Sequence, residues 1–191
     1  STVLQVLDFI SNLGSEDFSV ILERRGWKVA DIKSQLQKSQ KITLRCEVEL
    51  SIESNHVLVC WEVQLAAYTQ KNILELAYEE VTINNGGHEV PLLSYSVIKD
   101  SDNFIQNDIG GKMMKLPKFQ ADASLLKLMD FTDYPILQAL KIFLQNSDSF
   151  ELLSPEKMRL SSRGDVDSIG SAGEKLPSFI KSMNQEQKKN F

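Results

Sequence analysis

The most regular feature of the chain is an alternation of apolar and polar side chains over residues 42–52. The apolar positions are Ile42, Leu44, Cys46, Val48, Leu50 and Ile52. This period of two predicts a β-strand with one face toward a core and the other toward solvent. A second alternating run covers residues 57–65 after a short turn at residues 54–56. The two runs together predict an antiparallel hairpin.

The segment that follows the hairpin is ambiguous. Over residues 73–83, Leu, Ala and Glu favour a helix, whereas the position after a hairpin favours a third strand; we predict a strand and keep the helix as the alternative. The turn sequence at residues 84–87 leads into a fourth apolar run at residues 89–99, in which Pro91 belongs at a sheet edge or a bulge. The middle of the chain is therefore predicted to be an antiparallel meander of three or four strands.

Helical spacing flanks this meander on both sides. Apolar residues recur every three to four positions over residues 3–13, which predicts a short amphipathic helix ended by a glycine. Residues 18–25 fit a helix or a strand and turn, and residues 29–36 carry a third helical stripe. After the meander, residues 125–129 and 133–144 predict two further helices, the second opened by an aspartate and a proline.

The C-terminal part of the sequence differs in composition from the rest. Residues 161–175 are rich in serine and glycine and predict a linker between a short helix and a final amphipathic segment. We therefore predict a single α+β domain over residues 1–150 and an appendage over residues 151–191. The domain is expected to have N-terminal helices, a three- to four-stranded antiparallel meander, and C-terminal helices packed on one face of the sheet.

Composition and charge restrict the function. The 191 residues are 42% hydrophobic, as in an ordinary globular protein that needs neither disulfides nor a metal to fold. With 21 basic and 26 acidic residues, the chain has no general attraction to phosphate backbones, which argues against direct nucleic-acid binding. No apolar stretch approaches the length of a membrane span, and no signal peptide is recognisable at the N-terminus. We therefore predict no membrane span and a cytoplasmic or nuclear location.

The residues that usually carry chemistry are few and scattered. His56 and His88 fall in predicted turns, and Cys46 and Cys60 fall in predicted strands without Cys-x-x-Cys spacing. A nucleophile–base pair or a tetrahedral zinc site would need distant elements to converge. The loop at residues 165–176 lacks two of the oxygen ligands of a calcium-binding loop. The sequence predicts no catalytic residue, no metal site and no bound cofactor.

Two C-terminal features and one aromatic side chain are candidates for regulation and binding. Ser154 precedes a proline in a pattern favoured by proline-directed kinases, although the same residues also fit a helix start. Phe179, Ile180 and Met183 would share one side of a helix beyond the linker, either docking on a partner or packing back onto the domain. With Trp27, these three residues are the predicted partner contacts.

The order of helix, antiparallel meander and later helices resembles the RWD and ubiquitin-conjugating-enzyme-like superfamily over residues 1–145. The segments that carry the resemblance are ITLRCEVELSI, VLVCWEVQL, HEVPLLSYSVIK and TDYPILQALKIFL. Active members have a catalytic cysteine after the meander, whereas no cysteine follows Cys60 here, and the Tyr-Pro-x-x-x-Pro signature is absent. The resemblance therefore implies a non-catalytic interaction domain, of the kind found in kinetochore and ubiquitin-pathway assemblies.

These observations predict a non-enzymatic protein–protein interaction domain, a subunit or adaptor of a larger cytosolic or nuclear complex. The partner would be another protein, in a homo- or heterodimer. The alternative is a small apolar ligand-binding domain or enzyme with a pocket between sheet and helices. In that case Trp61, Tyr78, Tyr95 and Phe143 would line the pocket instead of filling a core.

Overall fold

The computed structural model describes most of the chain up to residue 147. The described residues are 2–32, 40–52, 55–85, 87–98, 102–107, 111, 113–147 and 181. The predictions on Ser154, on the linker at residues 161–175, and on Phe179, Ile180 and Met183 lie outside these residues.

The chain separates by its internal contacts into two units. One unit, residues 12–145, contains the β-sheet and most of the helices, and the other comprises residues 1–11 and 146–191. Helix α1 (Thr2–Leu13) contributes residues to both. The domain division at residue 150 that the sequence suggests stays a prediction.

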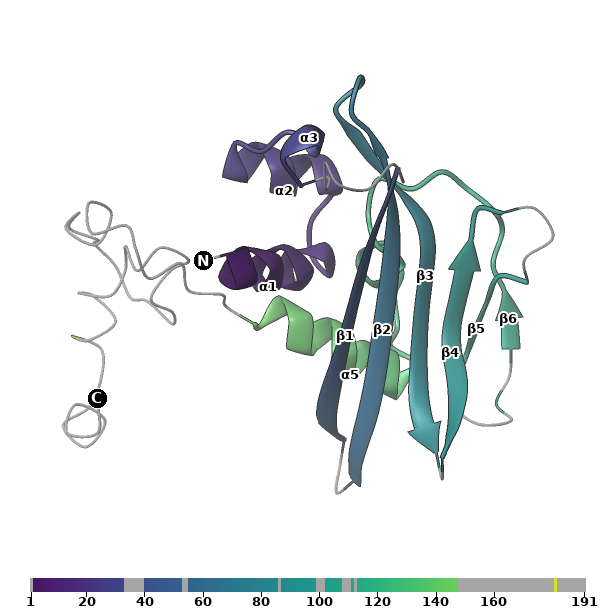
Figure 1. Cartoon of the computed structure of the whole chain (residues 1–191). Helices are drawn as coiled ribbons and strands as arrows, with labels where there is room; N and C mark the ends of the chain where they lie inside the picture. The colour runs from purple at the N-terminus through teal and green to yellow at the C-terminus, as the bar shows by residue number, and fades with distance from the viewer. Residues whose placement is uncertain are drawn as a thin grey trace. The chain divides into compact units, whose positions relative to one another are not determined.

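The core of the larger unit is an antiparallel sheet of six strands in the described residues. The strands are β1 (Lys41–Ile52), β2 (Asn55–Tyr68), β3 (Ile73–Asn85), β4 (His88–Ser96), β5 (Phe104–Gln106) and β6 (Met113–Lys115). Each strand pairs with the next one along the chain, so the order in space is the order in sequence (Figure 1). The α+β class and the meander are confirmed, and residues 73–83 form a strand. The predicted strand number was too low, because β5 and β6 are only three residues each and show no alternation.

The remaining described helices are short. They are α2 (Phe18–Arg25), α3 (Val29–Ile32), α4 (Leu125–Leu128) and α5 (Pro135–Gln145). The strand alternative for residues 18–25 was wrong: Gly26, at φ 63°, ends α2 by donating its N–H to the Glu23 carbonyl at 3.0 Å, a left-handed C-terminal cap that strands do not use. None of the helices in the described part is long and apolar enough to cross a membrane.

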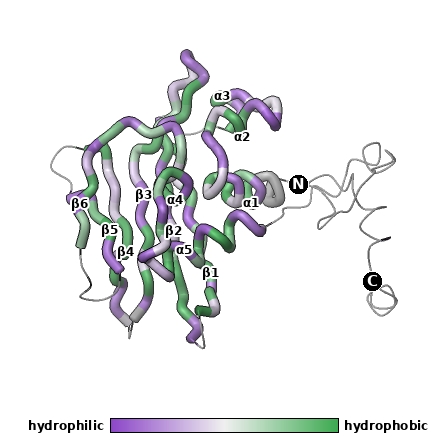
Figure 2. The backbone as a smooth tube through the Cα atoms, turned by 180° about the vertical axis from the view of Figure 1, so that it is seen from behind, coloured by the Kyte–Doolittle hydropathy of each residue, from purple (hydrophilic) through white to green (hydrophobic). Residues whose placement is uncertain are grey.

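Helices α4 and α5 lie against one face of the sheet, which leaves the other face open (Figures 1 and 2). The largest fully buried side chains of the larger unit are Tyr95, Phe18, Phe131, Leu13, Ile21, Leu65, Leu76, Leu92, Leu93, Ile105, Leu125 and Leu126. They come from the covered side of the central strands and from the helices and loops next to it. We call the two sides of the sheet the covered face and the open face.

Two bulges interrupt the sheet, both in pairs that involve β3. The register of β2 and β3 shifts between Gln64 and Leu65. In the pairing of β3 with β4, Val81 lies opposite Leu93 and Thr82 opposite Pro91, so that β4 carries one extra residue between them. Pro91 therefore lies at a bulge, as its sequence predicts, and its missing N–H costs the ladder little there.

Candidate functional site

Strand β1 forms one edge of the sheet. Its only strand neighbour among the described residues is β2, and the twelve residues of β1 pair with β2 in one continuous register without a bulge. The opposite edge is the three-residue strand β6. The sheet thus has one long, regular edge and one short edge (Figure 1).

The direction of the backbone groups of β1 follows from one hydrogen bond at its start. The N–H of Ala67 donates to the carbonyl of Gln40 at 2.7 Å, and in an antiparallel pair the residues that point toward the neighbour alternate. Even-numbered residues of β1 therefore bond to β2, and odd-numbered residues point their N–H and C=O away from the sheet. In the described structure, no backbone partner meets these outward groups on Thr43, Arg45, Glu47, Glu49 and Ser51.

A row of apolar side chains on β1 is only partly covered. Ile42, Leu44, Cys46 and Val48 lie on the covered face but are half-buried. The residues opposite them on β2 are Leu65, Val63, Trp61 and Val59, none of which is more than 2% exposed. Burial of the covered face therefore decreases from β2 to β1. On β1, partly exposed apolar side chains lie beside backbone groups that could form hydrogen bonds to a further strand. We call these four side chains and the outward backbone groups of residues 43–51 the β1 edge.

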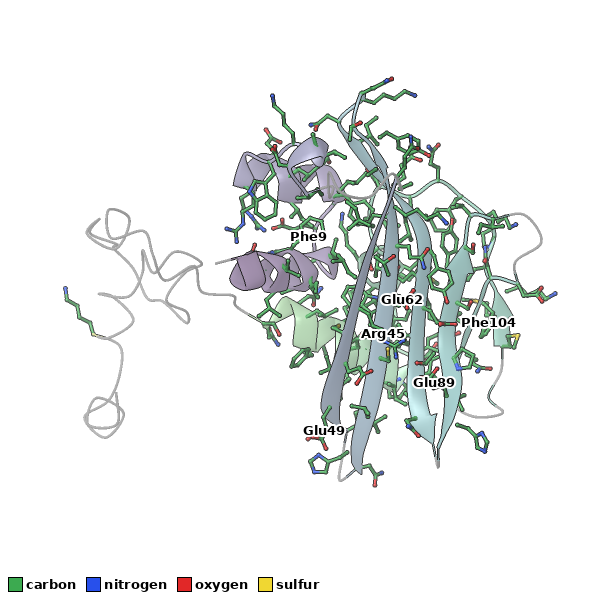
Figure 3. All side chains as sticks on the ribbon, in the orientation of Figure 1. Phe9, Arg45, Glu49, Glu62, Glu89 and Phe104 are labelled. Atoms are coloured by element: carbon green, nitrogen blue, oxygen red, sulfur yellow. The ribbon has the colours of Figure 1, made fainter. Side chains whose placement is uncertain are left out.

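The open face beside the β1 edge carries a group of charges around Arg45 (Figure 3). The guanidinium of Arg45 lies 3.4 Å from a carboxylate oxygen of Glu47, 4.0 Å from one of Glu62 and 3.9 Å from one of Glu89. The Arg45 side chain is half-exposed, so these ion pairs contribute little to stability. The residues themselves give β1 a pattern of charge on this face, positive at residue 45 and negative at residues 47 and 49.

Two adjoining hollows lie farther across the open face. They have volumes of about 620 and 360 Å³ and share Ala66, Tyr68, Ala77 and Val97. Alanine and serine side chains make the surface concave there, and Tyr78 lines the larger hollow. Burial, together with its hydrogen bond to Glu80, raises the pKa of Tyr78 well above its ordinary value, so the phenol stays protonated at neutral pH. The lining of the larger hollow also includes the charged side chains of Lys41 and Asp102.

Glu79 is the main polar group inside the core. Its side chain is fully buried on the covered face, where it accepts hydrogen bonds from Trp61 Nε1 at 2.9 Å, from Ser124 Oγ at 2.6 Å and from the N–H of Leu125 at 2.6 Å. The last two bonds join β3 to the start of α4, where the Ser124 hydroxyl also accepts from the Leu126 N–H. Glu79 therefore holds a short helix on the sheet, and it is shielded from any solvent-borne substrate.

The burial of Glu79 predicts a pH dependence of stability. Burial raises the pKa of the Glu79 carboxyl in the folded state above its ordinary value, and the three donors only partly offset this. The contribution of such a carboxyl to the free energy of unfolding is fully present below the unfolded pKa of about 4.5. This contribution is lost as pH rises through the folded pKa. In urea denaturation, the wild-type chain should lose stability relative to E79Q as pH rises from about 4.5, until the folded carboxyl is ionised. A constant difference across this range would contradict the raised pKa.

The two cysteines lie on opposite faces of neighbouring strands. Burial raises the pKa of the Cys46 thiol to about 11, and burial also raises the pKa of Cys60 on the open face. Both thiols are therefore protonated at neutral pH and lack the low pKa of reactive cysteines. His56 and His88 lie at the starts of β2 and β4 and are exposed. No group of three histidine, cysteine or acidic side chains in the described ranges is placed to hold a metal ion.

The structure does not gather the aromatic residues of the pocket alternative around one cavity. Trp61 and Tyr95 are buried in the core, whereas Tyr78 lies on the open face and Phe143 is 43% exposed on α5. Trp27, the one predicted partner contact that is described, is half-buried just after α2, with the Arg25 guanidinium 5.8 Å from its ring. An edge strand is expected from the predicted meander, but neither the residues of β1 nor Glu79 are among the candidate site residues that the sequence predicts.

Comparison with known proteins identifies no relative. No family model matches this chain, and neither the curated proteins nor the solved structures give a significant match.

Proposed function

We propose that this chain is a protein–protein interaction domain, a non-catalytic subunit or adaptor of a larger cytosolic or nuclear complex, and that it recruits its partner along the β1 edge. The observation that carries the proposal is the coincidence, on one long strand, of outward backbone groups and a half-covered apolar row. The resemblance to RWD-like interaction domains is part of the same proposal.

An extended segment can add to such an edge as a further strand. The backbone hydrogen bonds would supply affinity for any extended chain, while side chains on alternate positions would select the partner. Sheet proteins usually protect an edge by making it short, by charged side chains, by a proline or by a bulge. The strand β6 is short, whereas β1 is long, has neither a proline nor a bulge within residues 41–52, and carries only its charged side chains as protection. This contrast favours β1 as the edge that pairs with a partner.

The proposal is tested by photo-crosslinking in cells with benzoylphenylalanine placed at position 49. Glu49 is exposed on β1, and a strand added to the β1 edge would pass next to it. The matched control carries the same group at position 115, which is also exposed and lies on β6 at the opposite edge of the sheet. We expect a discrete adduct from position 49 and none from position 115.

A second change separates specific pairing from accidental contact. Glu47 points its N–H away from the sheet, so E47P removes a donor that the partner needs without removing a bond to β2. We expect E47P to abolish the adduct from position 49 while the purified protein stays folded. An adduct that survives E47P, or the absence of any adduct from position 49, would refute the proposed role of the β1 edge.

A further inference from the structure

We propose that the partner at the β1 edge is a second copy of this chain, joined by antiparallel pairing of β1 with itself about a two-fold axis at Cys46. The inference rests on the proposed function, because it names the occupant of the same edge. Three properties of β1 support it: its charge pattern, the direction of its backbone groups, and the way in which two such edges cover each other.

The faces of the sheet restrict the register of such a pair. Residues that lie opposite each other in an antiparallel pair point to the same face. For the apolar rows of both copies to stay on the covered face, odd residues must oppose odd residues and even residues must oppose even ones. The two-fold axis must therefore pass through a residue of β1 and not between two residues.

The charges of β1 choose among these registers. An axis at residue 45 would place the two copies of Arg45 opposite each other, an axis at residue 47 would do the same with Glu47, and an axis at residue 48 would oppose Glu47 to Glu49. Like charges directly opposite each other destabilise a strand pair. An axis at Cys46 instead places Arg45 opposite Glu47 of the second copy, twice by symmetry, and uses residues 41–51 on both copies. An axis at residue 44 also avoids opposed like charges, but it pairs only residues 41–47 because β1 begins at Lys41.

The apolar row agrees with the same register. Leu44 would oppose Val48 of the second copy, and Ile42 would oppose Leu50. The half-buried side chains of the two copies would then cover each other across the axis, which extends the core where the monomer leaves it thin. An isologous contact of this kind also closes on itself. It pairs the β1 edges of both copies, and β6 becomes the outermost strand at each end of the combined sheet.

The alternating direction of the backbone groups of β1 fits this pairing, and it places Cys46 where a crosslink can report the register. Arg45 and Glu47 both point their N–H and C=O outward, so they can exchange two hydrogen bonds with the second copy. Cys46 points its backbone inward and would form a non-hydrogen-bonded pair with its own copy, with a Cα separation of about 4.5 Å. That separation lies within the range of a disulfide.

The first test is oxidative crosslinking of the full chain with copper phenanthroline at pH 8.5. Two Cys46 thiols would release two protons to water and pass two electrons to two Cu(II) ions, and the two sulfurs would form an intermolecular disulfide. We expect the C60S chain to give a covalent dimer on a non-reducing gel and the C46S chain to give none. Both chains keep one cysteine, so each serves as the control for the other. Equal dimer yields from the two chains would overturn the register.

The second test uses charge reversal in solution, read by sedimentation equilibrium. E47R places two arginines opposite each other and R45E places two carboxylates opposite each other, so each variant alone should dimerise at least about tenfold more weakly than wild type. An equimolar mixture of the two variants restores opposite charges and should regain the dimer. Thermal melting checks R45E, because position 45 faces Glu62 on β2. Failure of the mixture to recover would overturn the pairing.

The outcomes separate this inference from the proposed function. A chain that stays monomeric up to high micromolar concentration, while position 49 crosslinks to a different protein, overturns the second copy as partner and leaves the β1 edge as the recruiting surface. A dimer that E47P and E47R leave unchanged must use another surface, which also overturns the inference. A position-49 adduct at twice the mass of the chain, lost in E47P, supports both.

Discussion

Replacing Glu79 by alanine is expected to lower the free energy of unfolding by about 3 to 5 kcal/mol. The change leaves the Trp61 indole N–H, the Ser124 hydroxyl and the Leu125 N–H without their common acceptor in a fully buried place. It also opens a cavity between β3 and the start of α4. The measurement is urea denaturation at pH 7, supported by a fall of roughly 10 °C in the thermal midpoint.

The matched control for this prediction is the next residue on the same strand. Glu80 points to the open face, where it bonds to Tyr78, and its truncation exposes no buried donor. E80A should therefore change the free energy of unfolding by less than about 1 kcal/mol. Similar losses for E79A and E80A would show that the buried hydrogen bonds of Glu79 contribute little.

Proline substitutions at two neighbouring positions of β1 are expected to differ strongly in stability. Val48 directs its N–H toward Val59 on β2, so V48P removes a ladder hydrogen bond and should cost about 3 kcal/mol or more. Glu47 directs its N–H outward, so E47P should cost well below this in the isolated chain. Both are measured by urea denaturation at a protein concentration at which the chain is monomeric.

The valine side chain requires its own control. V48A removes the same apolar atoms without removing the N–H, so the difference between V48P and V48A isolates the backbone effect of proline. If E47P and V48P destabilise the chain equally after this correction, the assignment of even-numbered residues of β1 as those that hydrogen-bond to β2 is wrong. The outward direction of its odd-numbered residues, and the proposals that depend on it, would then have to be abandoned.

The strands that the sequence predicts well are those with long alternation. The even-numbered positions of residues 42–52 and the odd-numbered positions of residues 57–65 point to the covered face, as their alternation predicts, whereas Leu58 and Cys60 lie on the open face. Strands β5 and β6 escaped prediction because three residues carry no measurable period. Because such short strands show no period, the sequence between residues 97 and 117 predicts a loop.

The candidate site could be predicted only in part. Glu79 has the parity of Val81 and Ile83, so a carboxylate among apolar positions was a visible signal on β3. Its donors could not be foreseen, since Trp61 and Ser124 come from elements 18 and 45 residues away and meet it only in the folded chain. The alternation of β1 predicts a strand, but only the pairing pattern shows that it lies at an edge.

The strict strand order of the meander has a consequence for how the protein folds. Because each strand pairs with its predecessor in the chain, the sheet can form by successive hairpins, each of which closes only a short loop. Later strands add only on the side away from β1. The outward backbone groups of β1 are thus accessible as soon as the first hairpin forms, and they stay accessible while the later strands add. A second chain could therefore pair with β1 before either molecule has finished folding.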